Sequence, residues 1–587
     1  MILQALKEYY DRKAADPESG IAPPGWERKE LPFVIVIDAD GRVVRVEDTR
    51  VPDGKKLRAK AFLVPHSVKR ASGIAANLLW DNVEYATGIV CKGNASRVAE
   101  QHRAFLAALE DYADIPAVSA VVKCASRADW ESVFASLDEK VRAEWLKVCP
   151  FVSFRMEGVG EPVFRDPEFV SRFGERAFAE TGERRLCLVS GGQDVPETLH
   201  PAIKGVRDTN TTGGNIVSFN FDAANSFGKT QGGNAVIGKR AAFAYTTALN
   251  TLLGKDSRQK MQVGDATVVW WAERSGEPLE EGLIDFFAEP PKDDPDRNVQ
   301  AVEALYRSVD TGAFAVDAAS GRFYVLGLAP NAARISVRFW TVGTAAELAT
   351  RFRQYFEDLE IARGPNDKKH LSLWRLLVST APLGKSENIA PNLAGETMRS
   401  ILAGTPFPET LLQTAIRRCV VEHAVPYARA KLIKGCLNRK LRNNNPKKEK
   451  ELTVSLDKEN TNTGYLLGRL FAVLEKIQTD ANPGINATIR DKFYATASSS
   501  PVAVFANLMR LKNHHLAKIG GGGRVRYEQT IGEIAALLPP EFPAHLSLDD
   551  QGRFAIGYYH QNRDLWTSKK DKAESADKAA ETTSTEN

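Results

Sequence analysis

The sequence predicts an α+β fold, in which a mixed-sheet N-terminal region is followed by an all-helical C-terminal bundle. β-Branched runs alternate with helical stripes as far as Arg363-Gly364-Pro365, whereas beyond this point apolar side chains recur at helical spacing. The 587 residues are too many for one ordinary core, which predicts two or three domains. Hydrophobic residues at 43% and charged residues at 26% are typical of a soluble globular protein.

The N-terminal region, residues 1–365, begins with a helical stripe that runs from Ile2 to Tyr10. Residues 33–37 and 43–46 flank an Asp-Gly turn at Gly41, which predicts a β-hairpin. Residues 61–64 predict another strand, ended by Pro65. Further helices are expected over residues 99–112, 128–137 and 344–359, and strands over residues 151–155, 185–189, 266–272, 322–328 and 335–340.

The C-terminal region, residues 366–567, is expected to be a helical bundle. Asn443-Asn444-Asn445-Pro446 and the KKEKE that follows predict an exposed linker, so residues 452–567 are expected to form a bundle of their own. Gly520 to Gly523 predict a hinge within it. Residues 568–587 consist almost entirely of Lys, Asp, Glu, Ala, Ser and Thr, and are expected to be disordered.

A polar loop between residues 207 and 238 is the leading candidate for a binding site. It precedes a helical stripe over residues 242–252, and glycines allow its backbone to approach a partner closely. Amide side chains offer a donor and an acceptor, as base edges do, and a lysine suits a phosphate. The residues expected to make these contacts are Asn225, Lys229, Gln231 and Asn234.

Two other interpretations of this loop remain open. Gly and Asn favour turns, so an ordinary surface loop has the same composition. Gly228-Lys229-Thr230 matches the end of a phosphate-binding loop, but the required glycine five positions earlier is Ala223. The spacing therefore argues against a nucleotide hydrolase.

Two further groups of cations are candidate nucleic-acid contacts. Lys69 and Arg70 precede a Ser-Gly turn, and with Asn77 they are expected to contact a phosphate and a base; a solvated turn is the alternative. Between residues 417 and 450, eleven Lys or Arg stand against two Glu, although the net charge of the chain is only +4. The cations expected to bind a polyanion there, unless they form a solvated helix face, are Arg429, Lys431, Lys434, Arg439, Lys440 and Arg442.

The sequence offers no motif for catalysis or for a cofactor. The nine histidines are spread thinly, no metal-binding spacing occurs, and no serine lies in a nucleophile-elbow pattern. We therefore expect a binding protein rather than an enzyme, with no metal and no cofactor. No signal segment and no bilayer-length apolar run are apparent, which predicts a cytoplasmic protein without a membrane partner. The six cysteines, scattered and expected to be reduced, are Cys91, Cys124, Cys149, Cys187, Cys419 and Cys436.

Long segments of the chain resemble the large subunit of the type I-C CRISPR interference complex, Cascade. They follow one another in that family's order and spacing, from the first residue to beyond residue 500. They are MILQALKEYYDRK at the start, VKRASGIAANLLWDN (68–82), LVSGGQDVPETLHPAIKGV (188–206), the polar loop, AAFAYTTALN (241–250), ATVVWWAE (266–273) and NTGYLLGRLFAVLEKIQ (462–478).

The resemblance implies a DNA-binding subunit without nuclease activity. In that family the large subunit recognises a short flanking motif, the PAM, in double-stranded target DNA and helps to open the duplex. The backbone and handle-binding subunits hold the crRNA, and a helicase-nuclease is recruited afterwards. The family also implies a small subunit translated from the same gene, which would start near residues 452–456 or at Met398. A metal-dependent enzyme acting on nucleic acid and a general RNA-binding scaffold remain the alternatives.

Overall fold

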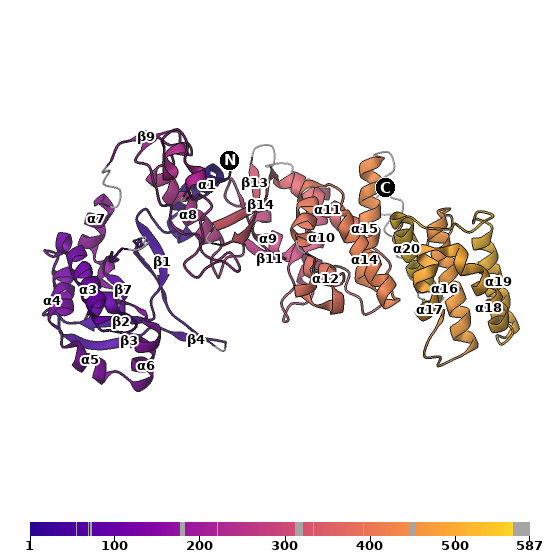
Figure 1. The fold of residues 1–587 in the computed structure, drawn as a ribbon, viewed down its shortest axis with the longest axis horizontal. Coiled ribbons are helices and arrows are strands. Elements are labelled where there is room, and N and C mark those ends of the chain that lie inside the picture. The colour runs from indigo at the N-terminus through magenta and orange to yellow at the C-terminus, as the bar shows by residue number, and fades with distance from the viewer. Residues whose placement is uncertain are drawn as a thin grey trace. The chain divides into compact units, whose positions relative to one another are not determined.

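The computed structural model describes residues 1–54, 56–68, 70, 73–176, 182–219, 221–311, 321–332, 334–390, 392–445 and 452–567 (Figure 1). The expectations for Lys69, for the KKEKE linker and for the tail from residue 568 fall outside the described residues. The chain divides into two compact units: unit 1 comprises Met1–Gly205, Thr209–Lys255 and Ala332–Arg334, and unit 2 comprises the remainder.

Unit 1 is built around a mixed four-stranded sheet in the order β3-β2-β8-β7. The central strands β2 (Phe33–Ile37) and β8 (Phe151–Met156) run parallel, whereas β3 (Val43–Asp48) and β7 (Trp80–Asn82) pair antiparallel to them. Every residue of β2 is buried, because helices pack on the sheet and their aromatic side chains meet those of the strands. For example, the ring centroid of Phe33 lies 5.7 Å from that of Trp145.

The Asp-Gly turn between β2 and β3 confirms the predicted hairpin. Gly41 adopts φ +83°, and the Asp38 carboxylate accepts hydrogen bonds from the backbone N–H groups of Asp40 (3.0 Å) and Arg42 (2.8 Å). A side chain at position 41 would also lie 2.7 Å from the backbone nitrogen of Cys124. The turn therefore needs glycine both for its conformation and for its close packing.

The remaining elements of unit 1 include α8, against which α1 packs. The aromatic rings of Tyr10 and Phe243 meet edge to face where α1 packs on α8. The elements are α1 (Ile2–Ala14), β1 (Trp26–Glu30), β4 (Val51–Asp53), β5 (Lys56–Arg58), β6 (Ala61–Pro65), α2 (Val83–Thr87), α3 (Ala95–Leu109), α4 (Pro116–Arg127), α5 (Trp130–Ser136), α6 (Glu139–Val148), α7 (Pro167–Arg176), β9 (Arg185–Leu186), β10 (Gln193–Asp194) and α8 (Lys239–Leu252).

Unit 2 begins with a second sheet, in the order β11-β12-β13-β14. Its central strand β12 is buried throughout, and the indole N–H of Trp270 donates to the carbonyl of Glu280 (2.8 Å) on the covering helix α9. A capping box between Thr344 and Glu347 starts α11, where the sequence predicts a helix. These elements are β11 (Lys260–Val263), β12 (Ala266–Ala272), α9 (Pro278–Phe287), α10 (Arg297–Asp310), β13 (Arg322–Asn331), β14 (Arg334–Thr344) and α11 (Ala345–Leu359).

From α11 onward the described residues contain helices and no strands, which confirms the predicted α+β class. Gly468 of α16 and Gly557 of α20 let these helices pack in backbone contact, because a methyl group on either glycine would collide with a carbonyl of the other helix. The helices are α12 (Leu373–Val378), α13 (Leu393–Ala403), α14 (Glu409–Glu422), α15 (Tyr427–Asn444), α16 (Thr463–Ala481), α17 (Ile489–Ser499), α18 (Phe505–Leu516), α19 (Gly521–Ala535) and α20 (Leu548–Trp566).

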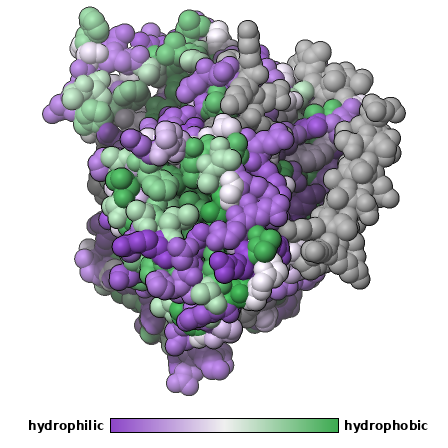
Figure 2. Space-filling view, turned by 90° about the vertical axis from the view of Figure 1, so that its right-hand side faces the viewer, coloured by the Kyte–Doolittle hydropathy of each residue, from purple (hydrophilic) through white to green (hydrophobic). Residues whose placement is uncertain are grey.

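The surface of the C-terminal helices is mixed in polarity. Figure 2 shows apolar side chains exposed among hydrophilic ones on the face that it views. Exposed large apolar side chains on these helices include Val525 and Trp566. Across the described residues, no helix combines the length and the apolar composition that crossing a membrane requires.

Candidate nucleic-acid interface

The polar loop is fixed to unit 1 at its C-terminal end. The backbone N–H of Leu188 donates to the carbonyl of Val236 (2.9 Å), and the N–H of Glu197 donates to the carbonyl of Ile237 (2.8 Å). The Asp194 carboxylate accepts from the Arg240 N–H (3.1 Å) in the first turn of α8, where a negative charge complements the helix dipole. The loop therefore projects from a fixed base.

The loop folds into two short 3-10 turns on either side of a tight turn. The N–H of Lys229 donates to the carbonyl of Ser226 (3.0 Å), and the two residues between them, Phe227 and Gly228, have φ of +52° and +69°. Two consecutive left-handed residues are the geometry of a type I′ turn. The 3-10 turns are Asp222–Ala224 and Gln231–Asn234.

All four residues that the sequence singled out in this loop have exposed side chains: Asn225, Lys229, Gln231 and Asn234. The amide N–H of Asn234 reaches the carbonyl of Ala224 at 3.5 Å. Among the described residues, no hydrogen-bond or ion-pair partner holds the ammonium group of Lys229 or the amide of Gln231. These groups are therefore available to an external partner.

Sequence reasoning missed the aromatic residue at the tip of the loop. Phe227 is 95% exposed, the highest value among the exposed large apolar side chains of the described residues. Such exposure is costly in water, and a positive φ is uncommon for a bulky residue. The available signal was an aromatic residue directly before Gly228 in an otherwise polar run.

The second predicted contact consists of Lys69, Arg70 and Asn77, of which the structure describes Arg70 and Asn77. The structure corrects the prediction for these two residues. The guanidinium of Arg70 donates to the carbonyl of Ala75 (2.5 Å), pairs with Asp81 and lies over the Tyr85 ring at 4.0 Å. Asn77 is buried, and its side-chain oxygen accepts from the N–H of Val68 (2.9 Å). These groups hold their own loop together instead of facing a nucleic acid.

The buried carboxylate explains why Arg70 turns inward. Asp81 is fully buried, and burial raises the pKa of its carboxyl, an effect that the neighbouring guanidinium opposes. Without Arg70 this carboxylate would lie in the core without a cationic partner, which is costly. The cation is therefore required inside the protein.

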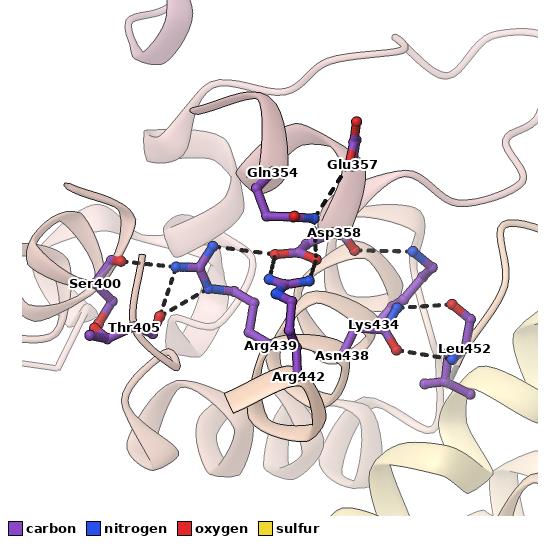
Figure 3. A network of polar contacts seen from close by, with 10 residues as sticks. All are labelled: Gln354, Glu357, Asp358, Ser400, Thr405, Lys434, Asn438, Arg439, Arg442 and Leu452. Carbon is purple, nitrogen blue, oxygen red and sulfur yellow. Dashed lines mark hydrogen bonds and ion pairs between the residues drawn. The ribbon is translucent and has the colours of Figure 1, made fainter. Parts of the chain in front are cut away.

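The basic segment is corrected in the same way, because α15 lies inside unit 2 rather than on its surface. Arg439 pairs with Asp358 and donates to the carbonyls of Ser400 (2.9 Å) and Thr405 (2.7 Å) (Figure 3). Arg442 makes two hydrogen bonds to the same Asp358 carboxylate, at 2.8 and 2.7 Å. Asp358 itself is fully buried, so these two cations neutralise a core carboxylate.

The other cations of α15 bind the carbonyl ends of neighbouring helices. The ammonium of Lys431 donates to the carbonyl of Leu359 (3.2 Å), and that of Lys434 donates to the carbonyl of Asp358 (3.1 Å), both at the C-terminus of α11. Arg429 donates to the carbonyl of Ser379 (2.7 Å), just after α12. Helix C-termini have unpaired carbonyls and a negative dipole end, which cations satisfy.

Only one of the six cations is substantially exposed. Lys440 has 38% of its side chain accessible and pairs with Asp549 (2.9 Å) and Glu409 (3.5 Å). Burial lowers the pKa of Lys431 to about 7, which is the opposite of what a phosphate-binding surface lysine needs. Most cations of the basic segment are therefore engaged inside unit 2 rather than presented on its surface.

A family model described as CRISPR-associated protein (Cas_Csd1) matches residues 6–566. No curated protein matches the sequence. Because the family match covers almost the whole chain, the chain belongs to the CRISPR-associated Cas_Csd1 family and is a subunit of a Cascade-type complex.

Proposed function

We propose that this chain is the large subunit of a type I-C Cascade complex and recognises the PAM in double-stranded target DNA. The observation that carries the proposal is the exposed loop of Asn225, Lys229, Gln231 and Asn234, fixed at its base. Amides read base edges and a lysine neutralises a phosphate, and one loop with both kinds of group suits a short duplex motif. The chain performs no chemistry on DNA in this proposal.

Phe227 gives the same loop a means of opening the duplex. Proteins that kink or open DNA insert apolar side chains between base steps, and the cost of unstacking is offset by new contacts. Phe227 stands at the tip of a tight turn, with exposed polar residues on both sides. The polar residues hold the PAM while the phenyl ring separates the next base pair. A separate helicase-nuclease is then recruited to the opened target.

The guide RNA and the small subunit complete the proposed assembly. Backbone and handle-binding subunits carry the crRNA, so base pairing reads the target beyond the PAM. A small subunit beginning near residues 452–456, or a longer product from Met398, arises from the same gene by internal initiation. Intact-mass measurement of the purified complex tests this part: the absence of a short C-terminal chain contradicts it.

The test of PAM recognition compares PAM-bearing and PAM-less duplexes in competition for the assembled complex. Gln231→Ala and Asn234→Ala are expected to lower the preference for the PAM, because each lost base contact costs about 1–3 kcal/mol. Gln300→Ala serves as the control, since Gln300 is exposed on α10 and no described residue partners its side chain. Unchanged discrimination in both loop variants removes the loop from this role.

The same competition separates the two alternatives. A metal-dependent nucleic-acid enzyme cleaves DNA when the isolated chain is given Mg²⁺ or Mn²⁺. A general RNA-binding scaffold prefers RNA and ignores the sequence that flanks the duplex. Either result overturns the proposal.

A further inference from the structure

Three side chains from separate segments of unit 1 converge beside the first sheet. They are Glu84 in α2, Cys91 in the turn before α3, and Cys149 directly after α6. The two sulfur atoms and a carboxylate oxygen of Glu84 all lie within 4.8 Å of one another. Glu84 is buried and both cysteines are half-buried, so the cluster is sheltered but still reachable from solvent.

Backbone hydrogen bonds fix the three ligands before any ion arrives. One oxygen of Glu84, Oε1, accepts from the N–H groups of Cys91 (3.1 Å), Lys92 (2.6 Å) and Gly93 (2.6 Å). No described residue donates a hydrogen bond to the other oxygen, Oε2. Three N–H donors on Oε1 therefore hold the carboxylate in place and leave Oε2 to bind something else.

Backbone hydrogen bonds also fix the position of Cys149, on the other side of the cluster. It ends α6 in the left-handed conformation, with φ +54°, and its N–H donates to the carbonyl of Trp145 (2.9 Å). The N–H of Val83 donates to the carbonyl of Pro150 (3.1 Å), which ties the start of α2 to the residue after Cys149. A left-handed non-glycine residue is uncommon, and here it directs the thiol at the other two ligands.

The Cys91 thiol donates a long hydrogen bond to the carbonyl of Ile89 (3.7 Å). Zinc binding replaces this weak contact, because cysteine binds a metal as the thiolate.

We propose that Glu84, Cys91 and Cys149 form a binding site for Zn²⁺. Tetrahedral zinc with bonds of about 2.3 Å to sulfur and about 2.0–2.2 Å to oxygen places neighbouring ligand atoms roughly 3.5–3.8 Å apart. Ligand atoms already within 4.8 Å need only small side-chain movements to reach that spacing. Two soft sulfur ligands select zinc over calcium or magnesium, which prefer oxygen ligands only.

Binding requires no oxidant or reductant. Each thiol loses one proton to solvent as its sulfur bonds to the ion, and a water molecule fills the fourth position. The bound ion joins the turn before α3 to the connection between α6 and β8. It therefore stabilises unit 1 against unfolding whenever zinc exceeds its dissociation constant.

The site is tested by metal binding to the full-length chain, kept reduced with a tertiary phosphine instead of a thiol reductant, because added thiols compete for zinc. After dialysis against Zn²⁺ and gel filtration, about one zinc per chain is expected by elemental analysis. Replacement by Co²⁺ is expected to give a thiolate-to-cobalt charge-transfer band, which reports sulfur ligation directly. Cys91→Ser and Cys149→Ser are each expected to lose the band and the bound zinc.

Matched controls keep this result interpretable. Cys436→Ala removes a buried thiol from unit 2 and is expected to keep both signals. Circular dichroism of each metal-free variant checks that it folds, and zinc is expected to raise the midpoint of thermal unfolding for the wild type but not for Cys149→Ser. No bound metal in the folded wild type, or equal binding by the folded serine variants, overturns the proposal. A Cys91–Cys149 disulfide that persists in reductant and excludes zinc also overturns it.

Discussion

Two lysines of this chain show that burial, rather than residue type, decides whether a cation is available to an external partner or pairs with groups inside the protein. Lys229 and Lys431 both lie in segments that suggested nucleic-acid binding. Lys229 is exposed on a loop, whereas Lys431 is only 3% exposed and donates to two backbone carbonyls. Local sequence does not distinguish these cases, because the partners of Lys431, Leu359 and Lys369, are more than 60 residues away.

The lowered pKa of Lys431 predicts that the free energy of unfolding depends on pH. Burial lowers its pKa from 10.5 to about 7 in the folded chain, so between pH 7 and 10 the unfolded chain binds a proton that the folded chain has released. The free energy of unfolding therefore rises with pH in this window, by at most about 1.4 kcal/mol per pH unit from this group. Denaturant unfolding of unit 2 at pH 7.5, 8.5 and 9.5 measures the rise.

Lys431→Met is the matched variant for that measurement. It keeps the unbranched side chain and removes the titrating group, so its stability is expected to change less with pH than that of the wild type. The groups that influence Lys431 most are Glu360, Lys434, Arg363 and Asp367, all of which remain in the variant. Parallel pH profiles for the two proteins contradict the prediction.

Phe227→Ala is expected to weaken duplex opening without lowering the free energy of unfolding of the chain. The side chain is 95% exposed, so the free energy of unfolding is expected to change by less than about 0.5 kcal/mol. Base–aromatic stacking is worth about 1–3 kcal/mol, so opening of the base pair next to the PAM is expected to fall by roughly 5-fold to 150-fold. Fluorescence of a base analogue placed at that pair reports opening in the assembled complex.

Leu383→Ala is the control for Phe227→Ala. Leu383 is 80% exposed and has φ +59°, so the substitution removes another largely exposed apolar side chain from a similar backbone conformation in unit 2. It is expected to leave opening unchanged. Equal opening by the wild type and Phe227→Ala refutes the role of the phenyl ring.

At the scale of elements, the cations of α15 connect this helix to the C-terminal ends of three other helices. Its cations bind Asp358 in the last turn of α11 and the carbonyls of Ser400 and Thr405 at the end of α13 (Figure 3). Another cation of α15, Arg429, binds the carbonyl of Ser379 after α12. Three helix C-termini therefore meet on one helix. The sequence showed the charge of α15 but not these partners, which come from elsewhere in the chain.

Asp358→Ala is expected to destabilise unit 2 strongly. Removing the carboxylate leaves Arg439, which is 2% exposed, without its charged partner, and breaking a buried pair in this way costs about 3–5 kcal/mol. Glu409→Ala removes the more exposed partner of Lys440 and is expected to cost at most about 1 kcal/mol. Denaturant unfolding distinguishes the two variants, and similar losses of stability contradict the assigned role of Asp358.

Elements that depend on local signals were predicted well from the sequence. The β2–β3 hairpin follows from its Asp-Gly turn, and α11 starts at the Thr344 cap. Predictions that depend on distant contacts were less accurate. The strand expected over residues 185–189 is confined to Arg185–Leu186, and the glycines expected to form a hinge instead begin α19, with Gly520 as its N-cap.

At the scale of the whole chain, the division into two units does not follow the change in secondary structure. The sequence placed a boundary at residue 365, where strand patterns end, whereas the units divide near Lys255. The sheet β11–β14 belongs almost entirely to unit 2, because its strands share one apolar core with the helices beyond residue 365. The polar loop lies in unit 1 and the basic helix in unit 2.

The C-terminal bundle is expected to stay bound when the chain is cut before it. The N–H and carbonyl of Leu452 both pair with the side chain of Asn438, each at 2.9 Å, and the Tyr559 hydroxyl donates to the carbonyl of Ala362 (2.7 Å). Buried apolar residues of α15, α16 and α20 also belong to one core. A protease site that replaces residues 446–451 therefore gives two pieces expected to co-elute in gel filtration.

Denaturing electrophoresis of the co-eluting fractions shows that cleavage was complete, since the pieces then migrate separately. Elution of the pieces at separate volumes under native conditions contradicts the prediction. Co-elution means that a product starting near Leu452 has a ready docking surface on α15, because the contacts that hold it do not require a continuous chain. The internal-initiation proposal needs such a surface, because a separate C-terminal chain must have a place to bind. On α15 the separate chain competes for that place with the covalently linked copy.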